Sequence, residues 1–331
     1  MISLIGDFFG FFMYWCFKFV KNYGLTIILF TLVTKIILLP ISIMVQKNSI
    51  KMVKMYPSMN RIKAKYFGNK DLISEEQYNL YKENNYHPML DLVPVVAQLV
   101  ILMGVIDVIY KPLRHLLKIS AEGIQALLDA FNNLTGVSLE VGSIQIQLVS
   151  YLSQNENLAK FTSELGDKMG NLISQADLDM ITNLNLHFCG FDFGVVPWEV
   201  KGIALLMPVL AAASSWLMCF TQNKSNVLQS EQSKGNQWTT LLISVGLSLY
   251  LGLFVPAGVG FYWIVSNLMS IAQMYILNWC ISPKKYIDYD DLEKSRKELD
   301  EVVKLSNEAN KGRSKEEIER EKADCKRLER L

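Results

Sequence analysis

Long apolar runs separated by charged loops dominate the pattern of this chain. The first run, Leu25 to Val45, holds one charged residue, and a helix of that length covers the roughly 30 Å hydrocarbon core of a bilayer. Four later runs carry charges only near their ends or not at all. We therefore predict an all-α membrane protein with five transmembrane helices, at 23–46, 89–111, 202–221, 238–255 and 258–281.

The charges of the loops predict the orientation of these helices. The loop 47–88 holds eight Lys and Arg residues against four Asp and Glu residues, and basic loops resist translocation. This loop is therefore expected in the cytoplasm, together with the loop 222–237 and the charged tail 282–331. The insert 112–201 and the N-terminus are then outside, where the aromatic segment 1–22 suits an interfacial amphipathic helix.

The loops have their own predicted structure. Residues 47–88 form a cytoplasmic helical hairpin broken near Phe67 to Lys70, with Met52, Met55, Met59 and Ile62 on one face. The basic hairpin either captures a partner or lies against anionic lipid. The tail is either a soluble extension without a specific role or a contact for the ribosome or another partner. The outer insert is predicted to be a small, mostly helical domain.

Composition narrows the classes of function. The 33 Lys and Arg residues balance 32 Asp and Glu residues, so no net charge favours direct readout of nucleic acid. The five cysteines form no close pair, which argues against a disulfide framework or a zinc site. No HExxH or GxSxG motif is present, and the three histidines lie in loops. We expect neither an enzyme nor a bound cofactor or metal.

Lys35 is the unusual residue, because it lies in the middle of the first predicted span. A Lys at that depth costs about 2.5 to 3.5 kcal/mol, so it is expected to face water or a partner. Thr31 and Ser42 share its helical face. Other spans offer matching polar positions, namely Gln98 and the line Tyr262, Ser266, Ser270 and Gln273. Together these side chains predict one hydrophilic groove enclosed by the five helices.

Two plainer explanations stand beside this one. Lys35 could form a structural ion pair with Asp107 or Asp91, although both carboxylates lie near the ends of their span, roughly 10 Å or more away in depth. Ser and Thr at helical spacing also serve simply to pack membrane helices together, which is the interpretation we favour for Thr240, Ser244 and Ser248.

Several stretches resemble the YidC/Oxa-type membrane protein insertases. They are NYGLTIILFTLVTKIILLPISI, the basic KNSIKMVKMYPSMNRIKAKYFGNK, DLVPVVAQLVILMGVIDVI, NLHFCGFDF and FVPAGVGFYWIVSNLMSIAQMYILN. The resemblance covers residues 22–112 and 185–282. It implies an ATP-independent insertase and chaperone of the bacterial cell membrane, whose partners are nascent membrane proteins, the lipid bilayer, the ribosome and the Sec translocon.

The resemblance also implies a site. Lys35 matches a groove position where members of the family usually carry Arg, while Thr31, Gln98 and Trp263 match neighbouring groove positions. With Tyr262 and Ser266 these form the predicted substrate groove. Lys keeps the charge of Arg but lacks its planar fork of five donors. The insert 113–184 is longer than in short members of the family, so the resemblance assigns it no role.

The main alternative is a secondary transporter or channel that uses Lys35 as an intramembrane ion or anion site. Such proteins often contain two similar halves with broken helices at matching positions. The sequence shows no such repeat. Insertion therefore remains the favoured function.

Overall fold

The protein divides into two compact units, which we describe separately. The computed structural model describes residues 2–139, 142–225 and 234–311. The first unit comprises Met1–Pro40 and Pro94–Ile276, and the second comprises Ile41–Val93 and Leu277–Leu331. Within the described residues both units are helical, apart from one β-hairpin in the first, which agrees with the predicted all-α class. Parts of the predicted loop 222–237 and of the predicted tail lie outside the described residues.

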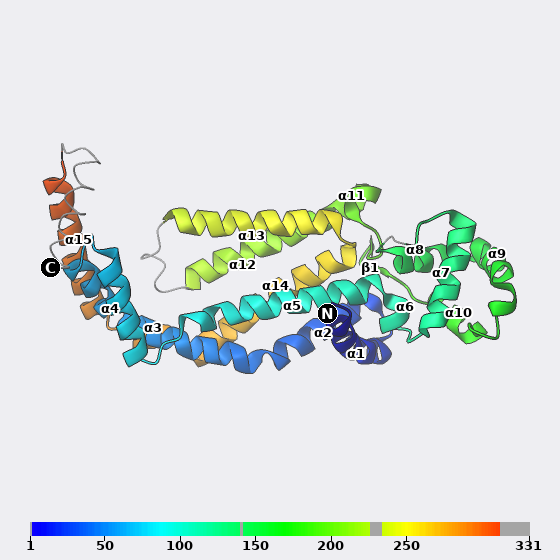
Figure 1. Cartoon of the computed structure of the whole chain (residues 1–331), viewed down its shortest axis with the longest axis horizontal. Helices are drawn as coiled ribbons and strands as arrows, with labels where there is room; N and C mark the ends of the chain where they lie inside the picture. The colour runs from blue at the N-terminus through cyan, green and yellow to red at the C-terminus, as the bar shows by residue number, and fades with distance from the viewer. Residues whose placement is uncertain (1, 140–141, 226–233, 312–331) are drawn as a thin grey trace. The chain divides into compact units, whose positions relative to one another are not determined.

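The apolar helices of the first unit run alongside one another (Figure 1). They are α2 (Tyr23–Ile37), α5 (Val93–Tyr110), α12 (Leu206–Ser225), α13 (Lys234–Phe254) and α14 (Ala257–Cys280). Of these, α12 and α13 pack tightly against each other. A Cβ atom at Gly252 of α13 would lie only 2.9 Å from Cα of Pro208 in α12, so a larger residue there would push the two helices apart.

Within the described part of the chain, two stretches are long and apolar enough to cross a membrane by themselves, Gly202–Ser225 and Ala257–Tyr286. The helix α2 passes the same test only together with the helix that follows it, as one bent pair. Shorter apolar stretches, Val96–Tyr110 and Leu241–Phe254, lie in α5 and α13. Each predicted span is therefore helical, and the crossing of the membrane by all five stays a prediction.

The first predicted span, 23–46, contains two helices. Asn22 caps α2, because its side-chain oxygen accepts a hydrogen bond from the backbone N–H of Leu25 at 3.0 Å. A single residue, Leu38, separates α2 from the next helix, α3 (Leu39–Lys65). The break falls where Pro40 has no backbone N–H for the helical ladder and its ring crowds the preceding turn. Ser42, expected on the face of Lys35, lies in α3 and in the second unit.

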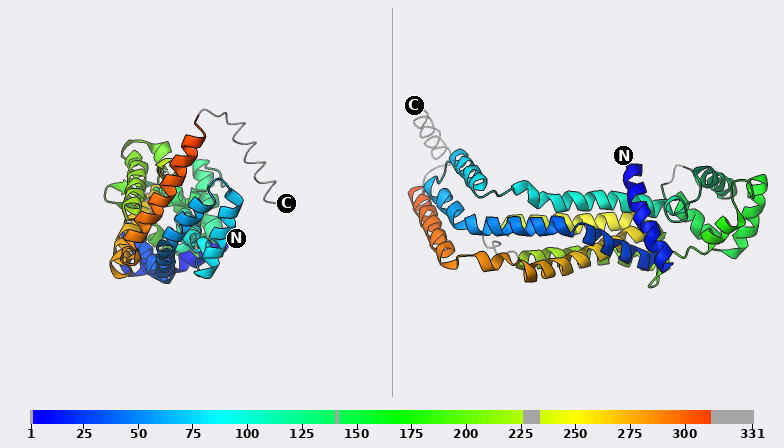
Figure 2. Two further views of the ribbon diagram at one scale, coloured as in Figure 1. Left: turned by 90° about the vertical axis from the view of Figure 1, so that its left-hand side faces the viewer. Right: turned by 90° about the horizontal axis from the view of Figure 1, so that it is seen from below.

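The insert is a group of short helices whose buried side chains belong to the same core as those of the long helices of the first unit. The helices gather at one end of the long helices of the first unit, as Figures 1 and 2 show. They are α6 (Pro112–His115), α7 (Ala121–Thr135), α8 (Ile144–Leu152), α9 (Asn155–Leu165) and α10 (Gln175–Thr182). Their shared interior contains fully buried Leu127, Leu148, Phe161 and Ile181. A mostly helical insert agrees with the sequence pattern.

A β-hairpin follows the insert and was not anticipated from the sequence. Its strands, β1 (His187–Phe188) and β2 (Phe191–Asp192), pair antiparallel. Cys189 and Gly190 connect them, both with positive φ (51° and 83°), as a tight two-residue turn requires. The short helix α11 (Pro197–Val200) and a 3-10 turn at Gly202–Leu205 then lead into α12.

The N-terminal helix α1 (Ile2–Val20) has one buried and one exposed apolar face. The exposed side chains recur every three or four residues: Leu4, Phe8, Phe11, Trp15 and Phe19. Phe9, Met13 and Cys16 lie on the buried face. This arrangement is typical of a helix that lies in a membrane interface, as its sequence predicts.

Two glycines bring α1 close to α5 and α6. A Cβ atom at Gly6 would lie 2.0 Å from the carboxylate of Asp107, and one at Gly10 would lie 2.4 Å from the ring of His115. Asp107 is buried and bonded to Lys111, and its Oδ2 lies 3.0 Å from Nε2 of His115. The backbone of α1 therefore rests on a paired carboxylate and imidazole.

In the second unit, α3 packs with α4 (Lys70–Glu83) and α15 (Tyr289–Ala309), near two 3-10 turns at Pro88–Leu92 and Pro283–Tyr286. The turn between α3 and α4 contains Gly68 at φ 90°, and Asn69 caps α4. Of the predicted apolar face, Met55 and Met59 are buried. The predicted tail 282–331 starts with the turn at Pro283–Tyr286, which α15 follows.

Candidate functional site

Lys35 is the only charged residue of α2, and neutral side chains bind it. Its Nζ donates a hydrogen bond to Oγ of Ser270 at 2.7 Å and lies 3.5 Å from Oε1 of Gln98. Ser270 belongs to α14 and Gln98 to α5, so three helices meet at this ammonium. Because these partners are neutral, they solvate the charge of Lys35 without cancelling it.

The contacts continue from Lys35 along α14. Nε2 of Gln98 donates to Oγ of Ser266 at 3.1 Å, and the hydroxyl of Tyr262 contacts both of these side chains. Oγ of Ser270 donates to the backbone oxygen of Ser266 at 2.8 Å. The spacing of four residues places Tyr262, Ser266 and Ser270 on one face of α14. We call these five residues, Lys35, Gln98, Tyr262, Ser266 and Ser270, the polar cluster.

The polar cluster is more exposed at one end than at the other. Tyr262 and Ser266 are each only 1% exposed. Lys35, Gln98 and Ser270 are half-buried. A group that approaches the cluster therefore meets the ammonium end before the tyrosine end.

The predicted alternative, an ion pair between Lys35 and Asp107, is wrong. Asp107 lies at the C-terminal end of α5 and is bonded to Lys111, with His115 beside it. The side chain of Asp91 lies outside the described part of the structure. Among the described carboxylates, none forms a salt bridge with Lys35.

Thr31 lies close to the polar cluster in sequence but turns its hydroxyl to its own helix. The Oγ1 atom donates to the backbone oxygen of Ile27 at 2.6 Å, and the residue is fully buried. Thr34 bonds in the same way to the backbone oxygen of Thr31. The structure therefore does not show Thr31 in contact with Lys35, and its role in a groove stays a prediction.

Trp263 lies in a second group, which we call the serine–tryptophan cluster. Its members are Trp263, Asn267, Ser214, Ser215 and Ser248, from α12, α13 and α14. Nε1 of Trp263 lies 3.0 Å from the hydroxyls of both Ser215 and Ser248, and Nδ2 of Asn267 donates to Ser214 and Ser215 at 2.9 Å. This network ties three helices together, which is the packing role predicted for Ser248.

Sequence reasoning missed Asn267 and the serine pair at 214–215. A signal was present, since an amide inside an apolar helix needs partners in a membrane. Helical spacing, however, cannot say on which neighbouring helix the partners lie. Trp263 and Ser266 are three residues apart on α14, yet they contact different helices.

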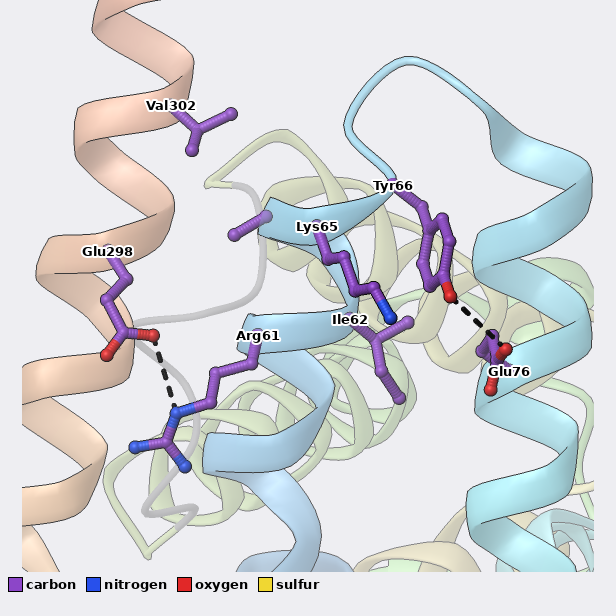
Figure 3. Close-up of a pocket in the computed structure, with 8 residues that line it drawn as sticks. Arg61, Ile62, Lys65, Tyr66, Glu76, Glu298 and Val302 are labelled. Atoms are coloured by element: carbon purple, nitrogen blue, oxygen red, sulfur yellow. Dashed lines mark hydrogen bonds and ion pairs between the residues drawn. The ribbon is translucent and has the colours of Figure 1, made fainter.

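A separate cavity of about 510 Å³ lies in the second unit, between α3, α4 and α15 (Figure 3). Arg61 of α3 forms ion pairs with Asp291 and Glu298 of α15, and the hydroxyl of Tyr66 lies 3.4 Å from Glu76 of α4. The Arg61 guanidinium lowers the pKa of the Asp291 carboxyl by hydrogen bonding to it. The cavity is lined by both signs of charge, which does not single out one ligand.

No site for a metal is visible in the described ranges, which contain no group of three or more His, Cys, Asp and Glu side chains placed to bind one. The cysteines at 16, 189, 219 and 280 are free thiols, and Cys325 lies outside these ranges. The candidate site is therefore the polar cluster, whose chemistry is that of one cation held among hydroxyl and amide groups.

Comparison with known proteins places this arrangement in a family. The model of the 60Kd inner membrane protein family matches residues 15–284. A protein of Fusobacterium nucleatum named membrane protein insertase YidC is 33% identical over 107 residues, which are 32% of this chain and 52% of that protein. Proteins with the same name from Clostridium perfringens and Amoebophilus asiaticus are each 24% identical, over 77% and 81% of this chain.

The share of each relative that this chain covers varies. It is 78% for the Clostridium protein, about half for the Fusobacterium protein and 34% for the Amoebophilus protein. The family model, in contrast, extends over most of this chain and includes every residue of the polar cluster. The chain therefore belongs to the 60Kd inner membrane protein family, the family of the YidC/Oxa-type proteins that its motifs resemble.

Proposed function

We propose that this protein inserts nascent membrane proteins into a bacterial membrane, without ATP, through a hydrated groove that contains the polar cluster. The names of its relatives and its membership of the family support this activity. The single observation that carries the proposal is the environment of Lys35. A cation that is bound by Ser270 and Gln98, with no carboxylate beside it among the described residues, keeps its attraction for an incoming anion.

The proposed mechanism follows from the cost of moving polar groups into hydrocarbon. The backbone and charges of a polar tail lose water there, which costs several kcal/mol for each group. A groove that admits water as far as Lys35 shortens the dry part of the path. The ammonium has three donors, so it can bind an acidic residue of the tail while it keeps its contacts to the protein. Partition of the adjacent apolar segment into lipid then drives the net reaction.

The remaining parts have proposed places in this scheme. Five helices cross the membrane with the N-terminus outside, and the helical hairpin α3–α4 lies in the cytoplasm with α15. The hairpin receives nascent chains from the ribosome or rests on anionic lipid, and the Sec translocon is a proposed partner. Deletion of residues 52–80 tests the first role, since normal insertion after that deletion would favour lipid contact alone.

The test of the central proposal is substitution of Lys35. Lys35→Ala should reduce insertion of small substrates that have acidic outer tails about ten-fold or more, whereas Lys35→Arg should be tolerated. Lys160→Ala is a matched control, because Lys160 is an exposed Lys of the insert, outside both the polar cluster and the basic hairpin. Undiminished insertion by Lys35→Ala would contradict the proposal.

Photo-crosslinking gives an independent test. A crosslinker at Gln98, which belongs to the polar cluster, should capture stalled nascent chains. One at Ser248, which belongs to the serine–tryptophan cluster, should capture few. Equal capture at both positions would show that substrates do not follow the polar cluster.

A further inference from the structure

The β-hairpin carries an aromatic cluster that joins α2 to α14. Its members are Tyr23 of α2, Phe188 and Phe193 at the hairpin, and Phe261 of α14. The rings of Phe193 and Phe261 are stacked at 4.7 Å, and the ring of Phe188 lies 5.6 Å from Phe261 and 6.0 Å from Phe193. Tyr23 adds a fourth ring 6.3 Å from Phe193. Contacts of this kind are favourable beyond the area that they bury.

Glycine makes room for this cluster. A Cβ atom at Gly24 would lie 2.2 Å from Cγ of Phe188, so the ring of Phe188 sits directly on the backbone of α2. No other residue leaves that space. The close approach of the Phe188 ring to α2 therefore depends on the missing side chain of Gly24.

Hydrogen bonds hold the same segment to the first turn of α14. The backbone oxygen of Val195 accepts from the N–H of Ala257 at 2.8 Å, and that of Phe193 accepts from Gly258 at 3.0 Å. The first N–H groups of a helix have no partner within the helix, so the segment after β2 satisfies two of them. The aromatic cluster is thus attached to both helices, but by noncovalent contacts alone.

The aromatic cluster and the polar cluster share these two helices. Phe261 directly precedes Tyr262, and Gly24 lies eleven residues before Lys35, about 17 Å along α2 at about 1.5 Å per residue. Between the two levels the inward side chains are closed to solvent, with Ile27 and Phe30 at 1% exposure and Thr31 at 0%. A path from the polar cluster along these faces of α2 and α14 therefore meets the aromatic rings.

We propose that the aromatic cluster is the outer gate of the site, which seals the polar cluster from the outside at rest and is displaced with the β-hairpin when a polar tail leaves. This inference rests on the proposed insertase function and on the proposed orientation. A one-sided groove needs such a seal, because an ammonium open to both faces would allow ions to leak. The strands of the hairpin have two residues each, and rings and two backbone hydrogen bonds attach the segment to α2 and α14, so its displacement breaks no covalent bond.

Accessibility of a thiol tests the seal without using insertion. The five native cysteines are replaced by alanine, and Ser270→Cys supplies a thiol in the polar cluster, at a position that is half-buried. Intact cells are treated from outside with a membrane-impermeant maleimide. We expect little labelling in this parent and at least a ten-fold higher rate after Phe188→Ala and Phe193→Ala together. Phe191→Ala is the matched control, because Phe191 lies in the same hairpin without a ring contact to the cluster, and its labelling should stay low.

Each outcome decides the proposal. Labelling of the parent from outside would show that no seal exists, and equally low labelling of all variants would show that these rings are not the seal. If the double variant does not fold, Gly24→Ala replaces it, since a methyl group there displaces the Phe188 ring while alanine still favours the helix. Insertion by Lys35→Ala is measured separately, and its loss supports the proposed function. The labelling rates alone decide whether the aromatic cluster is the gate.

Discussion

Replacement of Lys35 by methionine should make the protein more stable and less active. Methionine has a similar length, fits among apolar helices and lacks the charge. The site is held by neutral partners at 2.7 Å and 3.5 Å, so removal of Lys35 leaves no buried carboxylate behind. Ser270 and Gln98 keep their other hydrogen bonds, to the backbone and side chain of Ser266.

The magnitude follows from two opposing quantities. A Lys at the centre of a membrane helix costs about 2.5 to 3.5 kcal/mol. Interhelical hydrogen bonds in membranes contribute about 0.6 kcal/mol each, so the contacts of Lys35 to Ser270 and Gln98 offset about 1 kcal/mol of this cost. Water in the proposed groove lowers the cost of the charge, so Lys35→Met should raise the free energy of unfolding by at most about 2 kcal/mol. Insertion of substrates with acidic tails should fall as in Lys35→Ala.

Equilibrium unfolding in mixed micelles measures the first effect, and insertion into proteoliposomes measures the second. Lys160→Met, a change at an exposed position of the insert, should alter neither. A loss of 1 kcal/mol or more in Lys35→Met would refute the reasoning, because it would mean that the ammonium is a structural element of the bundle. If stability rises but insertion is unchanged, the charge of Lys35 takes no part in the mechanism.

Three further predictions concern other parts of the molecule. Asn267→Ala removes two interhelical hydrogen bonds and should lower the free energy of unfolding by about 1 to 3 kcal/mol. An unchanged unfolding midpoint in micelles would contradict this. Burial lowers the pKa of His115 below its usual value of about 6.5, although the hydrogen bond that the ring donates to Asp107 opposes this shift. The unfolded chain therefore binds more protons, and stability should fall as pH drops through about 6.5. His115→Gln should flatten that part of the dependence of Tm on pH, and a profile identical to that of the parent would count against it. Arg61→Gln removes exposed ion pairs to α15 and should raise the rate of limited proteolysis of α15 by no more than about five-fold. High salt should have the same effect on the parent, because it screens exposed charges. A larger effect would mean that Arg61 holds α15 through more than these pairs.

The sequence by itself determined the features that depend on one helix. The length and apolar character of each run predict the helices, and the spacing of four residues places Tyr262, Ser266 and Ser270 on one face of α14. The central position of Lys35 in an apolar run marks it as a residue that needs polar partners. All of these follow from periodicity and composition, which local backbone geometry converts directly into structure.

Only the tertiary structure decided which helices supply those partners. In the folded chain Ser270 and Gln98 contact Lys35. Asp107 instead contacts Lys111 and His115, and Trp263 lies in a separate cluster. The physical reason is that periodicity fixes the faces of a helix but not its rotation or depth against its neighbours. A threonine hydroxyl adds a second ambiguity, since it can bond to its own backbone, as Thr31 does. The packing of the Phe188 ring against the backbone of Gly24 likewise joins segments far apart in the chain, so only the tertiary structure shows it.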